Sequence, residues 1–158
     1  MVKNILVPID FHVASLNTLK LGLAHCKGEK VKAVLMYAQH LDDSITELMF
    51  YSPKKIIRSL LSPEFNQALE ILRNHFEGSL QEVAIELFHG NNKSFLNNFL
   101  HAHKIQEIFI PKTYELKKAK RAFDPLPLLK STNTKLTELD WNANYNKTEQ
   151  EQITALFN

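Results

Sequence analysis

The chain has 158 residues, 44% of them apolar and 23% charged, which is ordinary for one globular domain with a substantial core. Its net charge of +2 does not favour a nucleic-acid partner, and its single cysteine, Cys26, excludes an internal disulfide and a paired-cysteine metal site. The first residues run directly into an expected strand and no apolar run approaches the length of a membrane span, so we expect a cytoplasmic protein.

The first 62 residues predict two buried strands and the helices that follow them. Residues 5–9 form a short, continuous apolar run, as in a strand that is covered on both faces. Leucines then recur at helical spacing until Gly28, which is expected to end the helix. Residues 31–37 predict a second buried strand. Residues 39–62 are expected to hold one or two short helices that are interrupted at Pro53.

The next part of the chain predicts a long helix, an edge strand and another helix. Ser62-Pro63 is typical of a helix start, and Gly78 of a helix end. Residues 83–87 alternate between apolar and polar side chains, which favours a less covered, edge-like strand. The helix after Asn91 is expected to turn its apolar side chains inward, namely Phe95, Leu96, Phe99 and Leu100.

The last strands complete an α/β pattern. Residues 105–110 predict a fourth strand, Asp124-Pro125 predicts the start of a short helix, and residues 135–141 are a polar candidate for a fifth strand. Strands that alternate with helices indicate an open parallel sheet wound on both sides. We therefore expect one α/β domain over residues 1–141.

Residues 142–158 are expected to be a polar linker followed by a short helix or a disordered tail. Thr148 and Glu151 have the spacing of a capping box. They precede three apolar residues, Ile153, Leu156 and Phe157. We expect these residues to cover the apolar face of the fifth strand at Leu139 and Trp141, in the same chain or exchanged with a second one, and we expect a homodimer.

The run Asn4-Ile5-Leu6-Val7-Pro8-Ile9-Asp10, followed by Ser15, and the strand end Leu87-Phe88-His89-Gly90-Asn91 carry a family resemblance. Residues 1–141 resemble the universal stress protein family. The resemblance implies a flavodoxin-like, adenine nucleotide alpha hydrolase-like sheet of five strands in the order 3-2-1-4-5. Many members dimerise through the fifth strand. In the ATP-binding branch, base and ribose lie against the first and second strand ends, which implies as ligand residues Pro8, Asp10, Met36 and Tyr37.

The phosphate site of that branch is missing here. Pro111 and Tyr114 stand where the resemblance implies the two glycines of a Gly-x-x-Gly loop, and Ala122-Phe123 stands about where it implies a Gly-Ser pair. A phosphate cradle needs backbone N–H groups turned toward one point, and proline has no N–H. We therefore expect no ATP binding in the family manner and assign no cofactor.

A basic segment occupies the place of the phosphate loop. Residues 112–121 contain five basic residues and one acid. Lysine ammonium groups can hold phosphate without a glycine loop, so Lys112 is a further candidate ligand residue. The same reasoning makes a candidate anion patch of Lys117, Lys118, Lys120 and Arg121. The alternative interpretation is a solvated, charged surface, because salt screens exposed charges.

Histidines offer a more distant hypothesis. His12, His40 and His89 follow the first three strands, so a 3-2-1 order places them at one sheet edge near Asp10, where they can hold zinc. The alternative is three unrelated loop histidines, and we assign no metal site. Asp10-Phe11-His12 is similar to the loop of nucleotidyl transferases, but Ser15 replaces their second histidine. No sequence matches GxSxG, HExxH or a P-loop.

These observations favour a non-enzymatic, stress-linked regulatory or interaction module with a protein partner or a small anionic ligand, and with neither nucleic acid nor a membrane as partner. The alternative is a small-molecule or nucleotide binder that uses the Asp10 edge and residues 112–121 for the anion. A metal-assisted enzyme built on the histidines is the third hypothesis.

Overall fold

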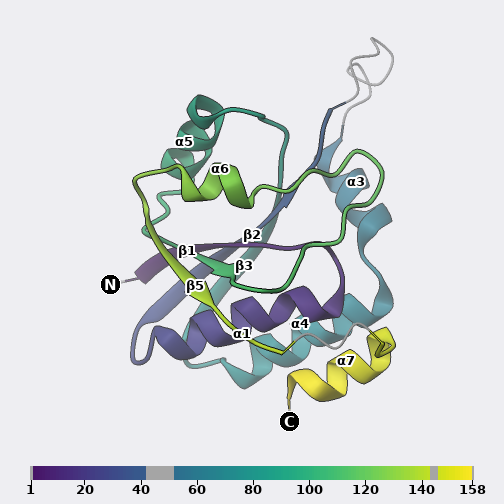
Figure 1. The fold of residues 1–158 in the computed structure, drawn as a ribbon. Coiled ribbons are helices and arrows are strands. Elements are labelled where there is room, and N and C mark those ends of the chain that lie inside the picture. Colours follow the sequence, from purple (N-terminus) through teal and green to yellow (C-terminus); the bar gives the residue numbers. More distant parts are fainter. Residues whose placement is uncertain (1, 42–51, 143–145, 158) are drawn as a thin grey trace.

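The computed structural model describes residues 2–41, 52–142 and 146–157 of the chain. Strands and helices alternate over most of this length, as Figure 1 shows. In chain order the elements are β1 (Val2–Pro8), η1 (Val13–Ser15), α1 (Leu16–His25), β2 (Lys30–Ala38), α3 (Pro53–Leu60), α4 (Pro63–His75), β3 (Leu80–Phe88), α5 (Lys93–Ala102), β4 (Glu107–Pro111), α6 (Leu126–Lys130), β5 (Lys135–Leu139) and α7 (Glu149–Leu156).

The five strands form one parallel sheet in the order β3-β2-β1-β4-β5, which confirms the expected α/β fold and strand order. Helices α1, α4 and α7 lie on one face of the sheet, and α5 and α6 lie on the other (Figure 1). The strand β3 is at the edge, as its alternating pattern predicts. Within the described residues, no helix is both long and apolar enough to span a bilayer.

Two apolar cores fill the space between the sheet and its helices. The larger core joins strand residues such as Ile5 and Leu35 to α1, α4 and α7, and includes the fully buried Phe65. The smaller core joins Leu6 and Ile108 to α5 and α6. Cys26 is buried in the larger core, and this burial raises the pKa of its thiol, which keeps it in the unreactive protonated form.

Side-chain caps set several helix starts. Ser52 and Ser62 each accept a hydrogen bond from the backbone N–H three residues on, and each is followed by a proline. Pro53 therefore begins α3 rather than interrupting a helix, because a proline at the first helical position loses no intrahelical hydrogen bond. Residues 42–51 of the segment expected to be helical lie outside the described residues.

The prediction for α5 is wrong at one position. Leu96 and Leu100 are buried and Phe99 is partly buried, but Phe95 is 55% exposed. The helix begins only at Lys93, and the side chain of Phe95 in its first turn leans against Gly90 rather than into the core.

The C-terminal residues form the helix α7 and pack on their own chain. Thr148 and Glu151 make the expected capping box, and Ile153 and Leu156 join the larger core. The helix contacts η1 and α4, and its packing on the face of Leu139 and Trp141 stays a prediction. Glu149 also accepts hydrogen bonds in this contact, because its Oε2 receives the backbone N–H of Val13 at 2.7 Å.

A buried ion cluster fastens the amino ends of β1, β4 and β5. Glu107 is fully buried, and its carboxylate accepts hydrogen bonds at 2.5 Å from Lys3 Nζ and from the Thr137 hydroxyl. Lys135 Nζ lies 3.7 Å away. Burial alone would raise the pKa of Glu107, but these hydrogen bonds and the lysine charges together hold that pKa below its usual value.

Candidate functional site

The carboxylate of Asp10 is the centre of the edge where ligands bind in open α/β sheets. It lies two residues after the end of β1 and is only 6% exposed. Its Oδ1 accepts the backbone N–H of His12 at 2.9 Å. Its Oδ2 accepts the Tyr114 hydroxyl at 2.6 Å and the backbone N–H of Lys117 at 2.9 Å. Two of the three donors thus come from the segment that follows β4.

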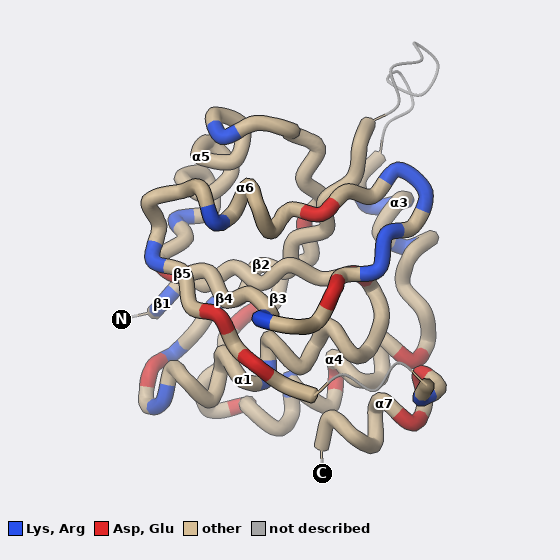
Figure 2. Tube along the Cα trace, viewed as in Figure 1, with Lys and Arg blue, Asp and Glu red and all other residues tan. Residues whose placement is uncertain are grey.

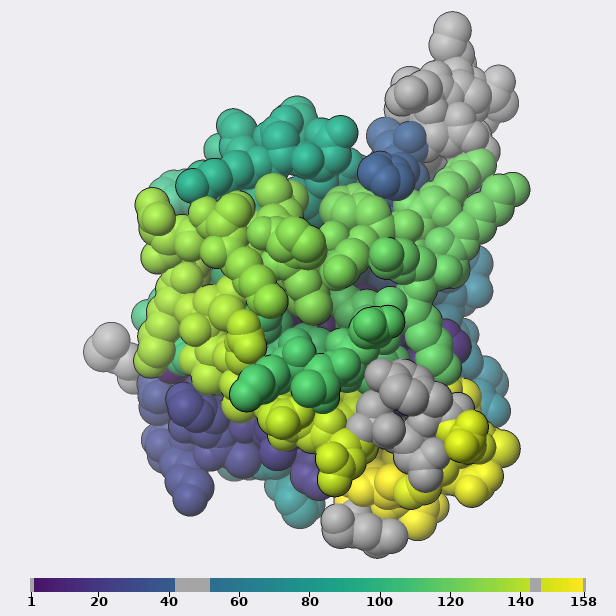
Figure 3. Space-filling view, in the orientation of Figure 1, coloured from purple at the N-terminus to yellow at the C-terminus, as the bar shows by residue number. Residues whose placement is uncertain are grey.

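That segment, residues 112–123, is called the closing segment below. Its far end pairs with the end of β2: His40 N donates to Arg121 O at 2.7 Å, Phe123 N donates to Ala38 O at 3.2 Å, and Gln39 and Ala122 form an antiparallel bridge. Because β1 lies between β4 and β2, the closing segment crosses the end of β1. Figure 3 shows the side chains of this segment, in green, spread over this side of the molecule.

A second contact holds the closing segment from the side of β5. Tyr114 is buried, and its ring stacks on Trp141 with centroids 4.7 Å apart and an angle of 29° between the planes. The indole N–H of Trp141 donates to the Thr18 hydroxyl on α1 at 3.2 Å. Trp141 is therefore covered by Tyr114 and bonded to α1.

Aromatic side chains fill the region beside the end of β2, where the family resemblance implies the base. Phe11 has a left-handed φ of 63°, which costs a residue with a side chain about 1–2 kcal/mol. Its ring lies 4.8 Å from that of Tyr37 and 5.5 Å from that of Phe65. Burial raises the pKa of Tyr37, and the charge of Asp10 raises it further, so its hydroxyl stays protonated.

Four of the five candidate ligand residues lie at the carboxyl ends of the neighbouring strands β1 and β2, but Met36 packs in the smaller core and Tyr37 in the larger one, on opposite faces of the sheet. Pro8 and Met36 face each other across the β1–β2 register and are buried, and Asp10 and Tyr37 follow them at the same edge. Lys112 is exposed at the end of β4, on the other side of β1, and its backbone N–H donates to Leu139 O at 2.9 Å.

The candidate anion patch is exposed along the closing segment. Figure 2 shows its lysines and arginine as a blue run on the loop between β4 and α6. The patch consists of Lys117, Lys118, Lys120 and Arg121. Lys118 and Lys112 also line a polar cavity of about 360 Å³ together with Thr113, Tyr114, Glu115, Leu116, Asp124 and Leu126.

The three histidines have separate neighbours. His12 Nδ1 lies 3.3 Å from Glu149 Oε1, the His40 ring lies 4.7 Å from that of Phe123, and His89 Nδ1 lies 2.8 Å from Gln39 O. Within residues 2–41, 52–142 and 146–157, no group of three His, Cys, Asp or Glu side chains is arranged to hold a metal ion.

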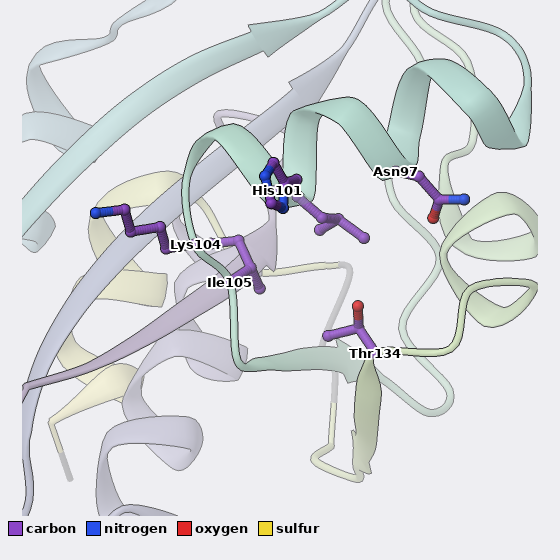
Figure 4. Close-up of a pocket in the computed structure, with 6 residues that line it drawn as sticks. Asn97, His101, Lys104, Ile105 and Thr134 are labelled. Carbon is purple, nitrogen blue, oxygen red and sulfur yellow. The ribbon is translucent and has the colours of Figure 1, made fainter.

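A further cavity of about 450 Å³ lies at the opposite end of the molecule, beside the C-terminal end of α5 (Figure 4). Asn97, His101, Lys104 and Ile105 line it from α5 and the turn that follows, and Thr134 lines it from the residue before β5. It contains none of the candidate ligand residues, so it is separate from the Asp10 edge.

Sequence reasoning missed the roles of Tyr114 and Glu107. A large aromatic hydroxyl at a glycine position, beyond a strand next to Asp10, was a signal for a hydrogen bond to that carboxylate. A lone glutamate in the otherwise apolar run before Ile110 was a signal for a buried ion pair, and Lys3 on the neighbouring strand is its partner. The stacking of Trp141 on Tyr114 had no sequence signal.

The fold is similar to that of solved universal stress protein structures. No protein-family model matches the chain, and no curated protein matches its sequence. Three similar structures are hypothetical protein PH0823 (16% identity, TM-score 0.52, covering 87% of this chain and 96% of that one), a universal stress family protein from Burkholderia pseudomallei (12%, 0.52, 87% and 95%) and hypothetical protein MJ0577 (15%, 0.51, 90% and 98%). At these identities the likeness shows the fold, and the fold implied by the family resemblance is confirmed.

Proposed function

We propose that this chain is a cytoplasmic, non-enzymatic regulatory or interaction module of the universal stress fold, in which the chain itself occupies the nucleotide edge. The arrangement of Asp10 supports this proposal, because its carboxylate is satisfied by donors from the same chain. A ribose hydroxyl would have to displace the buried Tyr114 hydroxyl from a charged acceptor, which costs about 1.5–3 kcal/mol.

Calorimetry with Mg-ATP tests this function. We expect no binding tighter than about 1 mM, because the closing segment replaces both the glycine loop and the ribose contact. Low-micromolar affinity in the unmodified protein would contradict the proposal. The homodimer stays a prediction, and light scattering coupled to gel filtration measures it.

The second candidate function is a binder of small anions at the closing segment. The exposed basic residues of this segment favour it, since lysine ammonium groups can hold an anion as point charges. Sulfate or phosphate should then raise the melting temperature more than chloride does at equal ionic strength. Equal shifts of the melting temperature would mean that these lysines form an ordinary solvated surface.

A further inference from the structure

An open apolar groove lies beside the far end of the closing segment. Its volume is about 370 Å³, and its walls are mainly apolar. His40 contributes from the end of β2, Asn91 from the residues before α5, and the other side chains come from the start of α6 and the residues around it. The lining residues are His40, Asn91, Phe123, Asp124, Pro127, Leu128 and Ser131.

The groove is built on hydrogen-bonded backbone and packed aromatic rings. The Phe123 ring lies 4.7 Å from that of His40 and 6.3 Å from the buried ring of Phe88. Both walls are tied to β2 by the backbone hydrogen bonds of His40 and Phe123. Asp124 is engaged in starting α6, because its Oδ1 accepts the backbone N–H of Leu126 at 3.0 Å. A preformed groove loses little entropy when a ligand fills it.

An exposed aromatic side chain, Phe95, lies near the groove. A Cβ built on Gly90 would lie 2.4 Å from Phe95 Cβ, so Phe95 packs directly over Gly90, the neighbour of the groove-lining Asn91. Among the described residues, Phe95 is the most exposed of the large apolar side chains. The exposed Phe95 side chain and the apolar groove beside it are both explained if a partner protein covers them.

The other border of the groove is positively charged. Arg121 is bonded through its backbone to His40, so the charged end of the closing segment reaches the groove wall. Lys118 and Lys120 are exposed just before it. None of the ion pairs found among the described residues involves these two lysines. Lys118 also shares a cavity with the groove-lining Asp124, so the groove has a basic rim formed by Lys118, Lys120 and Arg121.

We propose that this surface binds an acidic peptide segment of a partner protein. An aromatic or branched aliphatic side chain of the peptide fills the groove between Phe123 and Leu128, and neighbouring carboxylates lie over the basic rim. The charge of the rim favours an acidic segment, and the apolar walls favour a side-chain anchor over a nucleic-acid backbone. The inference rests on the proposed function, because it names the partner of an interaction module.

Peptide selection tests the inference directly. A random-peptide phage library is selected on the full chain, and the enriched sequence is synthesised with a fluorescent label. We expect enriched peptides to carry an aromatic or aliphatic residue beside clustered Asp and Glu. Fluorescence anisotropy should then show binding that weakens as salt rises. Enriched peptides that lack acidic residues, or no enrichment at all, would overturn the proposal.

Matched variants locate the contact. Lys118→Glu/Lys120→Glu and Pro127→Glu change exposed positions, so their melting temperatures should stay near that of the unmodified chain. Each should weaken peptide binding about tenfold or more. Lys27→Glu/Lys30→Glu makes the same charge change near the amino ends of β1 and β2, away from the groove, and should weaken peptide binding by less than about threefold. Equal effects of the two double variants would overturn the proposal.

Competition with RNA tests whether the groove and its basic rim bind a nucleic acid instead of a peptide. A labelled single-stranded RNA oligonucleotide that binds more tightly than the selected peptide and competes with it would also overturn the proposal. Mg-ATP probes the Asp10 edge, whereas the peptide probes the groove. If neither peptide nor ATP binds, only this inference is contradicted. Micromolar ATP binding contradicts the proposed function.

Discussion

The Tyr114 hydroxyl donates a 2.6 Å hydrogen bond to Asp10 Oδ2, across 104 positions of the sequence. Asp10 follows β1 and Tyr114 follows β4, so the bond fastens the closing segment to the edge where open α/β sheets bind ligands. The carboxylate that the family resemblance assigns to a ribose thus has a structural role here. The bond is buried and its acceptor is charged, which makes it one of the stronger kinds of hydrogen bond.

Replacing Tyr114 with phenylalanine removes only the hydroxyl. We expect Tyr114→Phe to lower the free energy of unfolding by about 1.5–3 kcal/mol, because a charged acceptor loses a buried donor. Urea denaturation measures the change. Thr113→Val is the matched control, since the Thr113 hydroxyl donates to Asp140 at an exposed position and its loss should cost less than about 0.5 kcal/mol. Equal unfolding free energies for Tyr114→Phe and the unmodified chain would contradict the prediction.

The fold was predictable because it follows from sequence patterns that span only a few residues. The apolar run at residues 5–9 and the serine cap at Ser62 act over a few residues, and parallel topology follows from alternation. The partners of Asp10 were not predictable, because they depend on a hydrogen bond between distant segments. The exposure of Phe95 also escaped prediction, since helical spacing assumes that every apolar residue in the stripe has a core to face.

The buried carboxylate of Glu107 should control stability at acid pH. Its pKa is below the usual value in the folded chain, so the ionised form stabilises the fold above the ordinary pKa of 4.5, and this stabilisation is lost as pH falls through the folded-state value. We expect Glu107→Gln to cost about 3–5 kcal/mol near neutral pH, because it leaves the Lys3 ammonium without its buried partner. Urea denaturation at several pH values measures both effects.

The dependence of the unfolding free energy on pH distinguishes the loss of the Glu107 charge from a packing defect. The pKa of Lys3 is raised, chiefly by its hydrogen bond to Glu107. Its contribution is therefore complete below the ordinary value of 10.5 and is lost as pH rises through the folded-state value. In Glu107→Gln both the acid and the alkaline losses should become shallower. A profile parallel to that of the unmodified chain would show that the charge of Glu107 has no such role.

Gly90 should tolerate no side chain. A Cβ there would lie 2.4 Å from Phe95 Cβ and 2.9 Å from Phe88 Cζ, closer than real contacts allow. Gly90→Ala should therefore lower the free energy of unfolding by about 1–3 kcal/mol and shift Phe95. Gly78→Ala is the matched control, because no atom lies within 4 Å of its added Cβ. Thermal denaturation compares the two, and a Gly90→Ala variant as stable as Gly78→Ala would refute the prediction.

The helix α7 is expected to stabilise the chain by packing on it. Leu156 is fully buried in the larger core, so Leu156→Ala should cost about 2–5 kcal/mol, whereas Thr154→Ala on the exposed side of the same helix should cost less than about 0.5 kcal/mol. Urea denaturation at several protein concentrations measures both.

If α7 docks on its own chain, the midpoint of urea denaturation is independent of protein concentration. If two copies exchange α7, the midpoint rises with concentration, because dissociation then accompanies unfolding. Equal midpoints for the two variants would mean that the docked helix adds no stability.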